Sequence, residues 1–312
     1  MNIPANLVDD FDSLHLADLT DDERSLLISY IALTRDITES NQLFEVFYFN
    51  LLHMRNSFVF NMNDTVFKTE HCPDYKSEFI AVNSQVINLI SSARTLIEFL
   101  RETANRWLGN SKDKNEKYKD KYNVYIKEIY DTSFNYRLLY NLRNYMQHGY
   151  LPVSFKEGKY SFDVNQILDT PHFNIKGQLK TDVENFIEKL EIPGETIACL
   201  SLTLTIADFT VKVTDIYRKF LFYIQKSVSS IYDEVKKLIK DKPSIVCDYN
   251  ETFKGYIIYD VDEHRYHCFY SKDNPNVMMS NYEKRVADIY KDEKQAYDDL
   301  YKHLTICTDV KL

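Results

Sequence analysis

The chain has 312 residues, with 38 Lys or Arg against 47 Asp or Glu, so its formal net charge is −9. Only 6 residues are glycine, and they lie far apart. This excludes the Rossmann GxGxxG, the Walker A loop and the GxSxG nucleophile elbow, because each of these motifs needs glycines close together. Scarce glycine also argues against a turn-rich all-β protein and favours long helices.

The first helix is expected to begin at Thr20. This residue is a good N-cap, and Glu23 stands in the capping-box position three residues later. Apolar residues then recur with helical spacing through Leu26, Leu27, Tyr30 and Leu33, and the pattern resumes from Leu43 to Met54. The polar, Asn-rich stretch 61–74 is interpreted as a connector.

Two further helical regions are predicted before residue 150. The first spans 77–108, and the second spans about 122–148, where Gly149 and Pro152 provide stop signals. The apolar positions of the first region repeat with a helical period. They are Val82, Val86, Leu89, Ile90, Ala93, Ile97 and Leu100.

The second half of the chain mixes strands with helices. Although Leu200–Ile206 alternates like a strand, we predict one long helix over 195–240. The switch from long helices to short strands near Pro243 predicts a boundary between a helical domain, 1–242, and a small α+β region, 243–312. The other expected elements are a β-hairpin at 153–164, a helix at 181–190, three strands at 245–249, 255–260 and 266–270, and a final helix at 282–304.

Three features of the sequence indicate where in the cell the protein is expected. They are its N-terminus, its apolar stretches and its cysteines. No basic segment followed by an apolar one begins the chain, so no secretory signal is expected. The most apolar stretch, 197–206, is much shorter than the roughly 18 residues of a membrane span. The 5 cysteines are scattered and form no CxxC pair, which favours free thiols. We therefore expect a cytoplasmic protein without a membrane partner.

One polar cluster stands at the end of the 122–148 region. On a helix, Arg143 pairs with Gln147 at i,i+4 spacing, and Asn144 pairs with His148. All four polar groups then share one side, while apolar neighbours take the core side. One interpretation is purely structural: Arg143 pairs with an acid, and His148 caps the helix C-terminus, where the dipole favours a cation. The other interpretation is a reactive site.

The sequence from Arg143 to His148 resembles the RNxxxH signature, within the looser R-x4-6-H pattern, of HEPN domains (higher eukaryotes and prokaryotes nucleotide-binding). The helix Ile90–Glu98 is similar to the earlier HEPN helix that directs a polar or acidic side chain at the motif. The resemblance covers about 76–152, with the 195–240 helix completing the bundle. It implies an all-α antiparallel helical bundle. Together with the hairpin and the C-terminal strands that the pattern predicts, the expected fold is mainly α, with an inserted β-hairpin and a small C-terminal α+β extension.

This resemblance also implies an activity. Many HEPN domains are dimeric, metal-independent ribonucleases that act as toxins or effectors in bacterial defence against phages. The implied reaction is attack of the RNA 2′-OH on the adjacent phosphate, which leaves a 2′,3′-cyclic phosphate and a 5′-OH. Neither a cofactor nor a metal is expected. The implied partners are RNA, a second copy that completes a composite site, and a regulatory protein or antitoxin.

The residues of the motif suit these steps. Arg143 can donate two hydrogen bonds to a phosphate in the transition state. His148 can transfer protons, because the ordinary pKa of histidine lies near 6.5. Asn144 can orient the imidazole or bind a sugar hydroxyl, and Glu98 can hold Arg143 or His148 in place.

A basic segment precedes the motif helix. Residues 101–127 carry eight bases and four acids, and the expected RNA path runs here. A solvated loop between helices is the plainer interpretation. The residues expected to contact RNA are Arg94, Arg101, Arg106, Lys112, Lys114, Lys117 and Gln147.

Two other functions stay open on the sequence. A non-catalytic HEPN-like module that dimerises, or senses a nucleotide or protein, is favoured by the net charge of −9, since RNA is repelled away from the basic segment. A zinc module is the weaker alternative, because no pair of its ligands has finger-like spacing. Its ligands would come from Cys247, His264, His267, Cys268, His303 and Cys307.

Overall fold

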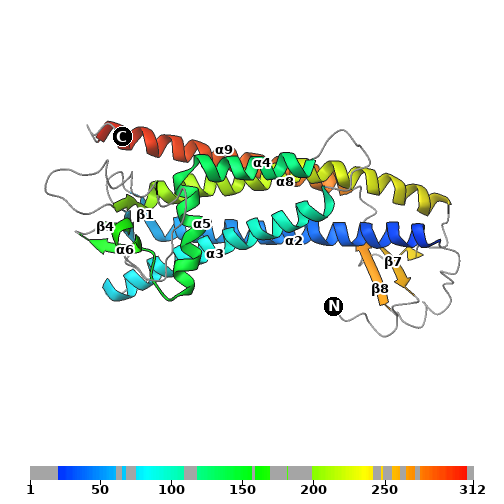
Figure 1. Cartoon of the computed structure of the whole chain (residues 1–312), viewed down its shortest axis with the longest axis horizontal. Coiled ribbons are helices and arrows are strands. Elements are labelled where there is room, and N and C mark those ends of the chain that lie inside the picture. Colours follow the sequence, from blue (N-terminus) through cyan, green and yellow to red (C-terminus); the bar gives the residue numbers. More distant parts are fainter. Residues whose placement is uncertain are drawn as a thin grey trace. The chain divides into compact units, whose positions relative to one another are not determined.

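The computed structural model describes most of the chain, and the fold is mainly helical (Figure 1). The described residues are 20–60, 65–67, 75–108, 118–156, 159–168, 181, 199–241, 247–248, 255–260, 265–270 and 275–307. The helices are α2 (Asp21–Ser57), α3 (Tyr75–Trp107), α4 (Tyr118–Thr132), α5 (Phe134–Gln147), α6 (Val164–Leu168), α8 (Leu202–Asp241) and α9 (Pro275–Cys307). None of the helices in these ranges is long and apolar enough to cross a membrane.

Short antiparallel strands accompany the helices. One sheet pairs β1 (Phe58–Phe60) with β2 (Thr65–Phe67). The second has the order β3 (Ser154–Lys156), β4 (Lys159–Asp163), β5 (Cys199–Ser201). The third has the order β6 (Cys247–Asp248), β7 (Gly255–Asp260), β8 (Arg265–Tyr270).

The chain divides into two compact units, each made of three separate stretches. Unit 1 comprises Met1–Glu39, Thr103–Tyr118 and Leu221–Lys284. Unit 2 comprises Ser40–Glu102, Lys119–Phe220 and Arg285–Leu312. Helices α2, α3, α8 and α9 therefore contribute residues to both units, and α4 contributes Tyr118 to unit 1 and its other residues to unit 2. The division at residue 242 stays a prediction.

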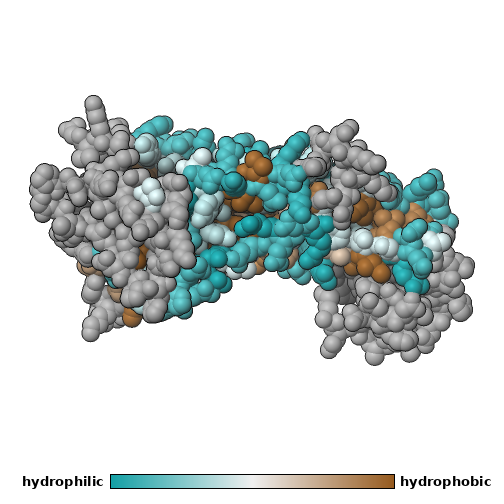
Figure 2. Space-filling model, viewed as in Figure 1, coloured by the Kyte–Doolittle hydropathy of each residue, from teal (hydrophilic) through white to brown (hydrophobic). Residues whose placement is uncertain are grey.

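The core of unit 2 contains the apolar positions predicted for α3. All seven, from Val82 to Leu100, are buried. Phe44 of α2 stacks on Tyr217 of α8, with ring centroids 4.4 Å apart. Leu138 and Leu142 are buried on the core side of α5. On the face of the molecule in Figure 2, hydrophilic residues cover most of the described surface.

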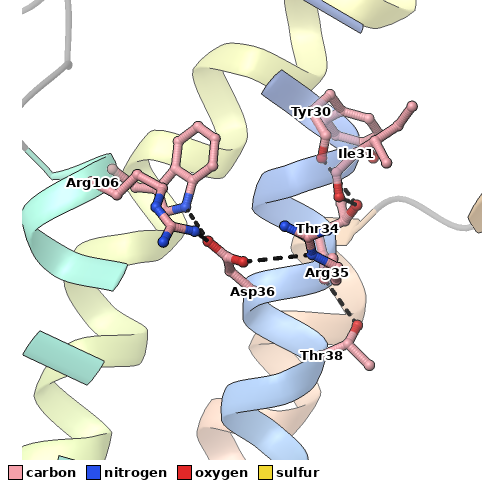
Figure 3. A network of polar contacts seen from close by, with 8 residues as sticks. Tyr30, Ile31, Thr34, Arg35, Asp36, Thr38 and Arg106 are labelled. Atoms are coloured by element: carbon pink, nitrogen blue, oxygen red, sulfur yellow. Dashed lines mark hydrogen bonds and ion pairs between the residues drawn. The ribbon is translucent and has the colours of Figure 1, made fainter. Parts of the chain in front are cut away.

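Unit 1 has its own small core and a buried polar network. Leu27, Tyr30, Val235 and Leu238 form the apolar cluster. The Asp36 carboxylate, with 3% of its side chain exposed, accepts hydrogen bonds from Arg106 (2.6 Å) and the Trp107 indole (2.8 Å) (Figure 3).

The capping box expected at the first helix is confirmed. The Thr20 backbone N–H donates to the Glu23 carboxylate at 2.8 Å, and the Glu23 N–H donates back to Thr20 Oγ1 at 3.3 Å. The reciprocal bonds satisfy N–H groups that a helix start leaves without intrahelical partners.

The helix predicted over 122–148 is in fact two helices, α4 and α5. Ser133 interrupts them in an extended conformation, with φ −105° and ψ 110°. Its hydroxyl accepts a hydrogen bond from the Tyr136 N–H at 3.2 Å, so Ser133 is the N-cap of α5.

The long helix predicted over 195–240 begins later, at Leu202. Residues 199–201 form β5 instead, because Leu200 pairs opposite Phe162 of β4. Residues 195–198 lie outside the described residues. The same is true of the helix predicted at 181–190, except for residue 181.

Several strand and helix predictions are confirmed, with adjusted ends. The hairpin at 153–164 is β3–β4, with Ser154 opposite Ser161, and the three C-terminal strands are β6, β7 and β8. The connector at 61–74 was predicted without structure, yet β2 lies in it, because its residues pair with β1 just before. The final helix begins at Pro275 rather than at residue 282.

Candidate functional site

Helix α5 carries the predicted motif, and its N-terminus is anchored to α8. Figure 1 shows α5 in green, running across the direction of α2 and α8. The Asp208 carboxylate of α8 accepts hydrogen bonds from Ser133 Oγ (3.0 Å) and Asn135 Nδ2 (3.1 Å). A carboxylate at this end also interacts favourably with the helix dipole.

The C-terminus of α5 ends in a tight turn. His148 is the C-cap, and its N–H donates to the Tyr145 carbonyl at 3.2 Å. Gly149 follows with φ +85°, a left-handed conformation that favours glycine, and its N–H donates to the Met146 carbonyl at 3.0 Å. The buried Tyr145 ring stacks on Tyr150, with centroids 5.0 Å apart. These contacts fix the direction in which the chain leaves the helix.

The polar side of α5 faces solvent, as the spacing predicts. Asn144, Gln147 and His148 are exposed, and Arg143 is half-buried. Arg143 Nη1 donates to Gln147 Oε1 at 3.0 Å, which is the predicted i,i+4 pair. Among the described residues, no acid pairs with Arg143, and Gln147 is the acceptor that its guanidinium finds. The expected acidic partner of the structural interpretation is therefore missing from the described part of the chain.

Asn144 bonds across to α3. Its side-chain oxygen accepts a hydrogen bond from Arg94 Nη1 at 3.0 Å. The same Nη1 group donates to the Tyr140 backbone carbonyl at 3.1 Å, and Arg94 Nε donates to Glu98 at 2.7 Å. The guanidinium also lies over the Tyr140 ring, 4.7 Å from its centroid. Arg94 thus ties α3 to the motif helix.

The structure brings only part of the predicted site together. Glu98 bonds to Arg94, so its link to Asn144 runs through that arginine, and no described contact joins it to Arg143.

The basic residues expected to contact RNA are scattered. Arg101 is exposed on α3. Arg106 belongs to unit 1, where it bonds to Asp36 (Figure 3). Lys112, Lys114 and Lys117 lie outside the described residues.

Two residues that sequence reasoning missed support the site. Tyr140 holds Arg94 with both its carbonyl and its ring. It stands four residues before Asn144, so i,i+4 spacing could have placed it on the same face. Asn83 of α3 is buried and exchanges two hydrogen bonds with the Val153 backbone, at 2.9 and 3.2 Å. Helix α3 therefore holds the chain on both sides of His148.

Metal ligation has no basis in the described residues, in which no group of three or more His, Cys, Asp or Glu side chains could hold an ion. The side chains of the alternative zinc module, from Cys247 to Cys268 and at His303 and Cys307, lie outside the described part of the chain.

Comparisons with known protein families, curated proteins and solved structures find no match to this chain.

Proposed function

We propose that the protein is a metal-independent endoribonuclease of the HEPN type, with its reactive groups at the C-terminal end of α5. One observation carries the proposal: Arg143 has no acidic partner among the described residues and lies five residues before the exposed His148. A guanidinium that no carboxylate neutralises attracts an anion such as a phosphodiester.

The reaction follows from these two groups. The 2′-oxygen of RNA forms a bond to the adjacent phosphorus, and the bond from phosphorus to the 5′-oxygen breaks. The 2′-OH loses a proton to a base, and the 5′-oxygen gains one from an acid, both roles that imidazole can fill. Arg143 stabilises the additional negative charge on the phosphate oxygens. The products are a 2′,3′-cyclic phosphate and a 5′-OH.

A second copy of the chain would complete the site. One chain supplies a single His148, whereas the reaction needs a base and an acid at once. In a homodimer with facing α5 ends, one imidazole accepts the proton and the other donates one. The biological role that fits such an activity is a toxin or defence effector in the cytoplasm, controlled by a regulatory protein or antitoxin.

A non-catalytic binding module is the second candidate. The net charge of −9 favours it, because a strongly acidic protein repels RNA over most of its surface. This module would use the same α5 surface to hold a nucleotide or a protein without cleaving it.

An RNA cleavage assay in the presence of EDTA distinguishes the ribonuclease from the non-catalytic binding module. Purified wild-type protein is incubated with structured RNA and EDTA, beside His148→Ala and Arg143→Ala. Catalysis predicts new 2′,3′-cyclic phosphate and 5′-OH ends for the wild type, and a loss of at least about 100-fold in each variant, within the usual range for general acid–base groups. His53→Ala is the matched control, since His53 is an exposed histidine of unit 2 on α2. Equal cleavage by all four proteins would contradict the proposal.

A further inference from the structure

The orientation of the Asn144 amide is fixed by chemistry. A guanidinium has only N–H donors and no acceptor. The Asn144 atom that faces Arg94 Nη1 at 3.0 Å is therefore the carbonyl oxygen. Because the two ends of an amide point apart, the NH₂ group of Asn144 faces away from Arg94, on the exposed side of α5.

Arg94 is itself held in place. Three of its N–H donors go to protein oxygens, on Glu98, Tyr140 and Asn144. Only 16% of its side chain is exposed, and its guanidinium lies over the Tyr140 ring. Glu98 compensates its charge at 2.7 Å. The protein thus uses three N–H donors of Arg94, whereas among the described residues Arg143 donates to Gln147 alone.

Gln147 has the same orientation as Asn144. Its carbonyl oxygen accepts from Arg143, so its NH₂ group also turns outward. This pair is exposed, and i,i+4 pairs on helix surfaces contribute only about 0.2–0.5 kcal/mol, so Gln147 is held less firmly. Together with Arg143, the two amides leave this face with N–H donors directed to solvent.

We propose that Arg94 is a positioning residue that turns the Asn144 NH₂ group toward the ligand, and that this group donates a hydrogen bond to a phosphate oxygen of the RNA backbone. This inference takes RNA as the ligand from the proposed function. It assigns Arg94 to the protein scaffold rather than to direct RNA contact. Since phosphates are the same at every nucleotide, the contact carries no sequence preference.

The decisive variant is Asn144→Asp. It keeps the oxygen that accepts from Arg94 and replaces the outward NH₂ by a second oxygen. Binding is measured with 2′-O-methyl oligomers of A, C and U, which cannot be cleaved because the 2′-oxygen is blocked. The expected result is an unchanged or raised Tm and a loss of affinity of about tenfold or more, equal for all three oligomers.

Gln42→Glu is the matched control, because it makes the same amide-to-carboxylate change at an exposed position of α2 in unit 2. Its affinity should match that of the wild type. In addition, Arg94→Ala should weaken binding in the wild-type background but have little further effect in an Asn144→Ala background, since Arg94 acts through Asn144.

The outcomes distinguish this inference from the proposed function. Binding without cleavage, with the loss in Asn144→Asp, overturns catalysis but supports the inference. Cleavage by the wild type together with full affinity of Asn144→Asp overturns the inference alone, as does a loss confined to one oligomer. A wild-type chain that binds none of the oligomers overturns the inference as well.

Discussion

Glu293 of α9 is a buried carboxylate, and Arg55 is its strong partner within the described part of the chain. Only 2% of its side chain is exposed, and Arg55 of α2 donates to both of its oxygens. Burial raises the pKa of Glu293 above its ordinary value, although the Arg55 charge and hydrogen bonds act in the opposite direction. The ion pair therefore compensates a desolvation cost within unit 2.

Removing Arg55 should leave the desolvation cost of the buried Glu293 carboxylate uncompensated. We expect Arg55→Ala to destabilise the protein by about 3–5 kcal/mol near neutral pH, because an unpaired buried carboxylate remains. The pKa of Glu293 then rises further, so the folded state binds a proton that the unfolded state has released. The free energy of unfolding of the variant therefore decreases as the pH rises from the pKa of Glu293 in the unfolded chain through its higher pKa in the folded chain. Urea unfolding at about pH 5 and about pH 8 should thus show the larger loss at pH 8.

Arg285→Ala is the control for this experiment. Arg285 of α9 pairs with Glu45 of α2, but the two side chains are 51% and 40% exposed. An exposed pair contributes less than about 1 kcal/mol, so its loss should be small at both pH values. Equal losses in the two arginine variants, independent of pH, would refute the explanation from burial.

Sequence spacing predicted one residue contact of the site and not the other. The Arg143–Gln147 bond lies within one helix, where four-residue spacing alone brings two side chains together. The Arg94–Asn144 bond joins residues 50 positions apart. It depends on where α3 and α5 cross, which is set by the packing of both helices and is not contained in either local pattern.

At the scale of elements, α5 is fixed at both ends by other helices. Asp208 of α8 binds its N-cap, and Arg94 of α3 binds Asn144 near its C-terminus. Short helices are marginal in isolation, so these end contacts and the buried core side stabilise α5. The same contacts place Arg143 and His148 relative to α3.

The N-cap contact is testable by one substitution. Ser133→Ala should reduce the free energy of unfolding by about 1–2 kcal/mol, because the Tyr136 N–H and the Asp208 carboxylate each lose a partner. Thr132→Ala removes a neighbouring exposed hydroxyl and should cost about 0.5 kcal/mol or less. The measurement is urea unfolding followed by circular dichroism. A larger loss in Thr132→Ala would contradict this account of the cap.

The features that the sequence analysis did not predict depend on partners far along the chain or on weak local signals. Ser133 has no Gly or Pro beside it, so the sequence around it carries no strong stop signal, and the break depends on the Ser133 cap. Strand β5 is three residues long and becomes a strand because β4 supplies its hydrogen bonds from far along the chain. The long helices, by contrast, repeat their apolar spacing over many turns, which makes their type readable from sequence.

At the scale of the whole molecule, the net charge limits how RNA could bind under the proposed function. A chain of charge −9 gains little from long-range attraction to RNA, so the proposed binding would depend on local donors such as Arg143. Each charged phosphate contact releases counterions and adds to the salt dependence of binding.

Salt titration tests this local mechanism. With the blocked 2′-O-methyl oligomers, Arg143→Ala should weaken binding and reduce the slope of log affinity against log salt by about 1. Asn144→Ala should weaken binding without changing the slope, because an amide carries no charge. Arg35→Ala, an exposed arginine of unit 1, serves as the control and should change neither. A slope unaffected by Arg143→Ala would exclude a phosphate contact by that residue.

The most direct test of RNA cleavage is made in cells. Wild type and His148→Ala are expressed to equal levels in bacteria, and total RNA is sequenced by a method that captures 5′-OH ends. We expect new 5′-OH ends and growth arrest with the wild type, and neither with His148→Ala. Identical RNA ends in the two cultures, with the wild-type protein folded and abundant, would contradict it.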